Sequence, residues 1–153
     1  PNCPALSHGQ RVKCGLSVSR GHTGPFGPLD MCAQDPSLAG IAKALHDLAS
    51  RSRSKKRVPA DASDATFTIT NPGVFGSLMG TPIMPVGTTA ILGLGAIEKR
   101  PKVITGPDGE DTIAIRTCAY FSLSFDHRIV DGADADRFMA DLKKKLENIP
   151  ESG

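Results

Sequence analysis

Residues 112–125 read TIAIRTCAYFSLSF, and the chain continues as DHRIVDG over residues 126–132. Apolar side chains occupy most alternate positions of the first stretch, and this period of two predicts one long β-strand. Gly132 then begins a predicted helix, whose apolar side is formed by Ala133, Phe138, Met139, Leu142 and Leu146. A strand that leads through a short turn into a helix is a rigid support for a catalytic side chain.

The segments before this strand predict the rest of a sheet. Residues 66–70 (TFTIT) are rich in β-branched side chains, which favours a strand, and the Gly- and Pro-containing stretch 74–87 predicts a loop. Residues 89–97 are apolar on both faces, as in a buried strand, and residues 99–105 are predicted to extend that strand beyond a bend. The sequence PDG at residues 107–109 then predicts a hairpin turn.

A helix is predicted ahead of the sheet. Asp35 is expected to cap it, with Pro36 as the first helical residue. The helix ends in the basic run 51–57, whose cations face the negative end of the helix dipole. Its apolar stripe consists of Leu38, Ile41, Ala42, Leu45, Leu48 and Ala49. The order helix, strand, loop, long hairpin, helix has no β–α–β rhythm and predicts an α+β domain with a largely antiparallel or mixed sheet.

The first part of the chain has a different character. Residues 1–34 are rich in Pro and Gly, and we expect them to be irregular apart from a short strand within residues 12–18. The well-patterned domain is therefore predicted to cover residues 35–149. Because the chain begins at Pro1 without a signal peptide, we interpret it as a fragment.

Composition excludes several classes of protein. The 153 residues carry a net charge of only +2, with no Trp and one Tyr, which argues against a nucleic-acid-binding protein. No apolar run approaches the length of a transmembrane helix, so no membrane partner is predicted. The four cysteines form no CxxC pair and no zinc-ligand spacing with histidine, so no metal site is predicted.

His127 is the strongest candidate for a catalytic residue, because it lies where the long predicted strand ends. Asp131 follows four residues later, across the turn. Spacing alone leaves two interpretations open. His127 is either a structural histidine with Asp131 as a simple helix cap, or an imidazole held ready for proton transfer.

The pattern HxxxDG formed by His127, Asp131 and Gly132 resembles the dihydrolipoamide acyltransferases, the core components of 2-oxoacid dehydrogenase complexes. Chloramphenicol acetyltransferases and peptide-synthetase condensation domains carry a related motif, so further segments matter. Four others are similar to the family in the expected order: residues 37–43, 67–73, 80–83 and 90–93. The resemblance covers the C-terminal half of the family's catalytic domain. Residues 1–34 match it poorly, as divergent sequence or a shifted reading frame would.

The resemblance implies a fold and a reaction. The fold is a chloramphenicol acetyltransferase-like α/β sandwich with flanking helices, here incomplete at its N-terminus. The reaction exchanges an acyl group between dihydrolipoamide and coenzyme A. His127 is then the general base. The reference pKa of a thiol lies about two units above that of an imidazole, so the proton transfer costs roughly 2.7 kcal/mol, which a catalytic base can supply. Thr70 matches the family's hydroxyl donor to the tetrahedral oxyanion, and Asp131 orients the loop or the imidazole.

The resemblance also implies partners. The family forms homotrimers with the active site between subunits, and trimers build a larger core. The lipoyl group is carried on a separate domain not present in this chain, and the decarboxylase and dihydrolipoamide dehydrogenase are the other components. We favour succinyl over acetyl or branched-chain acyl groups, hence the tricarboxylic acid cycle. The expected location is the bacterial cytoplasm, with the mitochondrial matrix as the alternative.

Two other functions stay open. A truncated relative without activity could serve only as a structural part of a core. An O- or N-acyltransferase of the same superfamily would use the same motif on a different substrate class.

Overall fold

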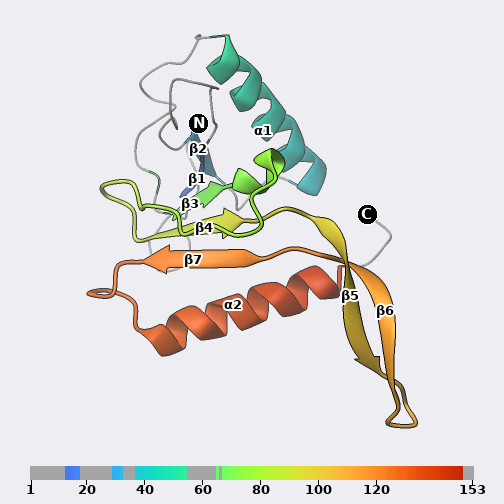
Figure 1. Ribbon diagram of the computed structural model, residues 1–153. Helices are drawn as coiled ribbons and strands as arrows, with labels where there is room; N and C mark the ends of the chain where they lie inside the picture. The colour runs from blue at the N-terminus through green and yellow to red at the C-terminus, as the bar shows by residue number, and fades with distance from the viewer. Residues whose placement is uncertain (1–12, 18–28, 33–36, 55–64, 66, 150–153) are drawn as a thin grey trace.

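A computed structural model describes residues 13–17, 29–32, 37–54, 65 and 67–149 (Figure 1). Its elements in chain order are β1 (Lys13–Ser17), β2 (Leu29–Cys32), α1 (Leu38–Arg53), β3 (Phe67–Thr70), the 3-10 helix η3 (Pro72–Phe75), β4 (Ala90–Leu94), β5 (Glu98–Thr105), β6 (Asp111–Cys118), β7 (Phe121–Phe125) and α2 (Gly132–Glu147). In the view of Figure 1 the two helices lie on opposite sides of the strands, and α2 runs alongside β7.

One mixed sheet organises the domain. Its strand order is β2-β1-β3-β4-β7. The inner pairs β1–β3 and β3–β4 are parallel, whereas the outer pairs β1–β2 and β4–β7 are antiparallel. The predicted α+β class with a mixed sheet is confirmed. The elements do not alternate as strand and helix, but the parallel neighbours β1 and β3 are connected in the chain through both β2 and α1.

The predicted long strand is two strands in different sheets. β6 pairs with β5 in a two-stranded ribbon that projects from the body, whereas β7 pairs with β4 (Figure 1). Gly95 and Tyr120 mark the transition, where the Gly95 amide donates to the Tyr120 carbonyl oxygen over 2.8 Å. The predicted extension of 89–97 into 99–105 divides in the same way, into β4 and β5. The link between β6 and β7 is two residues long, so apolar side chains continue at every second position across it. The sequence pattern therefore does not show that β6 and β7 pair with different strands.

The N-terminal segment contains more regular structure than the sequence predicts. β1 confirms the short strand expected within residues 12–18, but β2 lies in a stretch that was expected to be irregular. It pairs with β1 through backbone hydrogen bonds, which its Pro- and Gly-rich surroundings do not reveal. The predicted irregular residues 18–28 lie outside the described residues.

The first helix is capped by a residue that the sequence did not single out. α1 begins at Leu38, and the Ser37 hydroxyl accepts a hydrogen bond from the Gly40 amide at 3.3 Å. Ser37 therefore takes the capping role that was expected of Asp35. Asp35 and Pro36 themselves lie outside the described residues.

The buried core is centred on β4. Ala90, Ile91 and Leu92 are at most 6% exposed. On the face of the sheet that carries Phe67, α2 packs through Phe138, with ring centroids 5.8 Å apart. Neither helix in the described part of the chain is long and apolar enough to cross a bilayer.

Close packing just after β4 leaves no room for a side chain at Gly95. A Cβ atom there would overlap the carbonyl group of Leu78, which belongs to the loop after η3. We expect Gly95→Ala to lower the free energy of unfolding by about 1–3 kcal/mol, because backbone on both sides must move. Gly132→Ala is the matched control, since a Cβ there meets nothing within 4 Å. Urea denaturation of both variants measures the difference, and equal midpoints would contradict the packing argument.

Candidate active site

His127 lies in a tight turn between β7 and α2. The Ile129 and Val130 amides both donate to the Asp126 carbonyl oxygen over 3.0 Å, which closes the turn. The imidazole is exposed, and its centroid lies 5.4 Å from that of the Phe125 ring, with 44° between the planes. The turn predicted between strand and helix is therefore present, and it leaves the His127 ring open to a second molecule.

A charged pair flanks His127 on both sides in the sequence. The Asp126 carboxylate accepts hydrogen bonds from Arg128 Nε at 2.9 Å and from Arg128 Nη2 at 2.6 Å. These hydrogen bonds lower the pKa of the Asp126 carboxyl to about 2. Sequence reasoning missed this pair, although opposite charges two positions apart around a histidine were a usable signal.

Asp131 caps the last helix. Its Oδ1 accepts a hydrogen bond from the Asp134 amide at 2.8 Å, and its backbone is extended, as at an N-cap. The capping interpretation of this residue is therefore confirmed. Its expected role beside the imidazole of His127 stays a prediction.

Thr70 lies at the last position of β3, where it is half-buried. It pairs with Gly93 on β4, which in turn pairs with Ser122 on β7, so the three positions share one face of the sheet. A Cβ on Gly93 would come within 2.5 Å of the Ser122 hydroxyl and 3.3 Å of Pro82. The missing side chain thus lets Pro82, in the loop after η3, lie close to Gly93.

The structure does not bring Thr70 and His127 together within one chain. Thr70 is level with Gly93, whereas Phe125 is level with Ala90, three residues away along β4. At about 3.3 Å per residue this is roughly 10 Å along the strand, with β4 in between. His127 then follows beyond the end of β7. The two predicted catalytic side chains therefore lie at opposite ends of the sheet.

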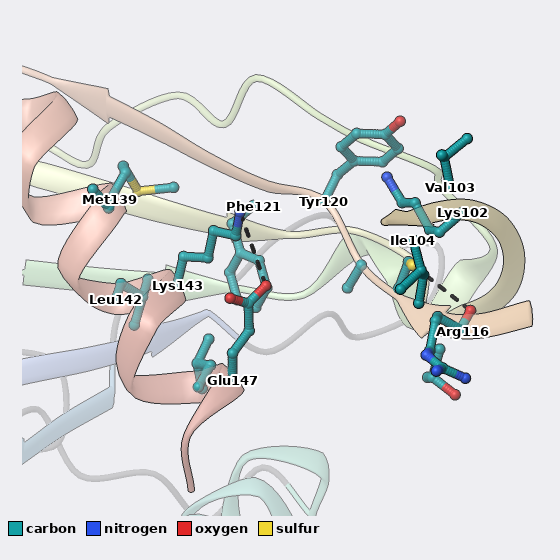
Figure 2. A pocket seen from close by; sticks show the side chains of 15 residues that line it. Lys102, Val103, Ile104, Arg116, Tyr120, Phe121, Met139, Leu142, Lys143 and Glu147 are labelled. Atoms are coloured by element: carbon teal, nitrogen blue, oxygen red, sulfur yellow. Dashed lines mark hydrogen bonds and ion pairs between the residues drawn. The ribbon is translucent and has the colours of Figure 1, made fainter. Parts of the chain in front are cut away.

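A groove of about 880 Å³ lies elsewhere, between α2 and the base of the β5–β6 ribbon. Figure 2 shows Tyr120, Met139, Leu142 and Lys143 around it. None of the three predicted site residues lines it. It borders the C-terminal half of α2, whereas His127 precedes the N-terminus of this helix, so the groove is separate from the candidate site.

The side chains available in the described residues restrict the reactions that the candidate site can support. Among the described residues, no three His, Cys, Asp or Glu side chains gather as a metal ion would require. An exposed imidazole at a strand–helix turn and a hydroxyl at a strand end suit proton transfer and oxyanion stabilisation.

These features define an α+β domain with an exposed histidine between the last strand and the last helix of a mixed sheet. Residues 27–152 match the model of the 2-oxoacid dehydrogenases acyltransferase catalytic domain. The chain therefore belongs to this acyltransferase family.

Curated relatives agree with the family. The chain is 55% identical over 115 residues to a Corynebacterium glutamicum protein and 46% identical over 124 residues to a Mycobacterium tuberculosis protein. Both are named dihydrolipoyllysine-residue acetyltransferase components of pyruvate dehydrogenase complex. It is 42% identical over 137 residues to a Bartonella vinsonii succinyltransferase component of 2-oxoglutarate dehydrogenase complex. These matches cover 75%, 81% and 90% of this chain, but only 17%, 22% and 32% of the relatives.

Solved structures show the same fold. A probable dihydrolipoamide acetyltransferase from Listeria monocytogenes matches 94% of this chain with a TM-score of 0.84 and 31% identity. The dihydrolipoamide acetyltransferase of Azotobacter vinelandii matches 91% with a TM-score of 0.80, also at 31% identity. The chain spans 58% and 55% of these two solved chains.

The Asp126–Arg128 pair gives a pH prediction. The pKa of the Asp126 carboxyl is lowered from 3.8 to about 2 in the folded chain, so the pair stabilises the fold above about pH 4. That contribution is lost as the pH falls through about 2. Carboxyl ¹³C NMR should place the midpoint there, and Arg128→Gln should move it back toward 3.8. A wild-type midpoint near 4 would contradict the interaction.

Proposed function

We propose that this chain contributes the active site of a 2-oxoacid dehydrogenase complex acyltransferase, which exchanges an acyl group between dihydrolipoamide and coenzyme A. The observation that carries the proposal is the exposed His127 in the strand–helix turn of a domain of this family. Residues 35–149 are then the C-terminal part of a chloramphenicol acetyltransferase-like catalytic domain. Coenzyme A is a substrate, and the lipoyl group arrives on a separate domain.

The proposed chemistry is a thioester exchange. His127 accepts the proton of the coenzyme A thiol, and the thiolate attacks the carbonyl carbon of the acyl-lipoamide thioester. A C–S bond forms, and the carbonyl oxygen becomes an oxyanion, to which the Thr70 hydroxyl donates a hydrogen bond. The tetrahedral intermediate then breaks its bond to the lipoamide sulfur, which takes the proton from the imidazolium. Acyl-coenzyme A and dihydrolipoamide are the products.

Two chains are needed for one such site. Both groups must lie about 3 Å from the reacting atoms, but His127 and Thr70 of one chain lie at opposite ends of the sheet. The proposed site therefore combines His127 of one subunit with Thr70 of another, in a homotrimer that builds a larger core.

An exposed apolar loop supports this assembly. The side chains that follow Thr70 leave at least 49% of their surface in contact with solvent: Val74, Phe75, Leu78, Met79, Ile83 and Val86. A group of apolar side chains of this kind is typical of a protein interface. Solved relatives include the cubic core of a pyruvate dehydrogenase multienzyme complex.

The acyl group, the partners and the location belong to the same proposal. The succinyl preference stays a prediction, because the similar proteins are named for acetyl and for succinyl transfer. The lipoyl domain, the decarboxylase and the dihydrolipoamide dehydrogenase are the proposed partners. The tricarboxylic acid cycle and the bacterial cytoplasm are the proposed setting, with the mitochondrial matrix as the alternative.

The alternative function is that of a structural relative, which packs in a core without catalytic activity. Acyl transfer from acetyl-CoA and succinyl-CoA to dihydrolipoamide separates the two functions. A measurable rate supports the enzyme, and no rate with either donor supports the structural protein.

Mixing two inactive variants tests the shared site. We expect His127→Ala to lower kcat about 10²- to 10⁴-fold and Thr70→Val about 10²- to 10³-fold. Co-refolding the two chains in equal amounts should restore about a quarter of the sites, because a random quarter of interfaces pairs both intact groups. A mixture no more active than its components would contradict a site built from two chains.

Asp131 is tested by separating its cap from its charge. Asp131→Ala should destabilise the fold by about 0.5–2 kcal/mol, whereas Asp131→Asn should keep the cap. In the Azotobacter vinelandii acetyltransferase, a histidine and an asparagine four positions apart have been investigated for their role in the catalytic mechanism. His127 and Asp131 have this spacing, so Asp131→Asn should also retain most of the activity. Loss of activity with unchanged unfolding midpoints would instead show that the carboxylate charge is required.

A further inference from the structure

The turn that carries His127 is anchored at one residue. The Asp126 amide donates to the Thr89 carbonyl oxygen over 3.0 Å, just before β4. The Asp126 carbonyl oxygen accepts both amides that close the turn. Asp126 thus joins the turn to the most buried strand of the sheet, and His127 is the next residue of the chain.

The side chain of Asp126 closes a second ring around the same turn. Its Oδ1 accepts the backbone amide of Arg128 at 3.0 Å and Arg128 Nε at 2.9 Å. Its Oδ2 accepts a hydrogen bond from Arg128 Nη2 at 2.6 Å, so two nitrogens of the guanidinium donate to the carboxylate. Because Arg128 is held by both its backbone and its side chain, the peptide units on either side of His127 are fixed.

This pair differs from the ion pairs on the helices. The pairs Arg137–Asp134 and Arg51–Asp47 join residues three and four positions apart within α2 and α1, which backbone hydrogen bonds already hold in shape. The Asp126 side chain is only 15% exposed, whereas that of Arg128 is 88% exposed. Because its cation is so exposed, the ion pair makes only a small contribution to the stability of the fold above about pH 4, and its main effect is on the shape of the turn.

We propose that Asp126 and Arg128 are positioning residues, which hold the turn in the one conformation that presents the His127 imidazole to its substrates. The inference rests on the proposed function of His127 as general base. A base must lie within hydrogen-bond reach of the proton that it removes. A displacement of about 1 Å at such a site can cost about 10²-fold in rate.

Kinetics of the full chain test the positioning role. We expect Asp126→Asn and Arg128→Gln each to lower kcat by about 10- to 100-fold, with KM within about twofold of the wild type. Arg128→Lys keeps the charge but loses the planar fork, so it should stay impaired. The double variant should be no worse than the poorer single variant, because the two residues act as one unit. Arg137→Gln removes a comparable exposed pair on α2 and should leave kcat unchanged.

A second measurement is independent of activity. We expect the Phe125 ring to shift the proton resonances of the His127 imidazole, because the two ring centroids are 5.4 Å apart. In Asp126→Asn and Arg128→Gln these resonances should move toward the values of free histidine, with little change in Tm. Should Asp126→Asn fail to fold, the same comparison is made with Arg128→Gln alone.

The outcomes are distinct. Unchanged kcat or unchanged imidazole resonances in folded variants would overturn the positioning role. If His127→Ala retains activity, the proposed function fails, while the resonances still decide whether the pair holds the turn. Loss of activity in His127→Ala together with full activity in Asp126→Asn would remove this inference alone.

Discussion

The pairing of β4 with two strands of opposite direction determines where the candidate catalytic residues lie. β3 runs parallel to β4 and β7 runs antiparallel to it. The C-terminal ends of β3 and β7 therefore point to opposite ends of the sheet. Thr70 ends one of these strands, and His127 follows the other. Their separation results from strand direction, so no adjustment of a loop within one chain would bring them together.

This separation connects the fold to the family. In the proposed function, the imidazole and the hydroxyl around one carbonyl carbon come from two subunits, because each chain carries them at opposite ends of the sheet. The loop after Thr70 exposes apolar side chains, which a free monomer would leave in water. At the other end, the turn around His127 is held by polar contacts and leaves the imidazole accessible.

Local patterns predicted those elements whose signal lies within a few residues. β3 follows from its β-branched composition, α2 from its apolar stripe, and the ribbon turn from the PDG sequence, where Gly109 has a φ of +82°. The patterns failed where distant segments decide. β2 forms only because β1 pairs with it, and β6 and β7 separate only because they meet different partners.

The sequence by itself determined the family, the α+β class and the position of His127 between a strand and a helix, because each depends on neighbouring residues and spacing. The tertiary structure alone decided strand order and direction, and hence the distance between Thr70 and His127. It also showed that Asp131 caps α2 while Asp126 binds Arg128. Asp126, Arg128 and Asp131 all lie within four residues of His127, which allows several pairings. Only the path of the backbone through the turn selects among them.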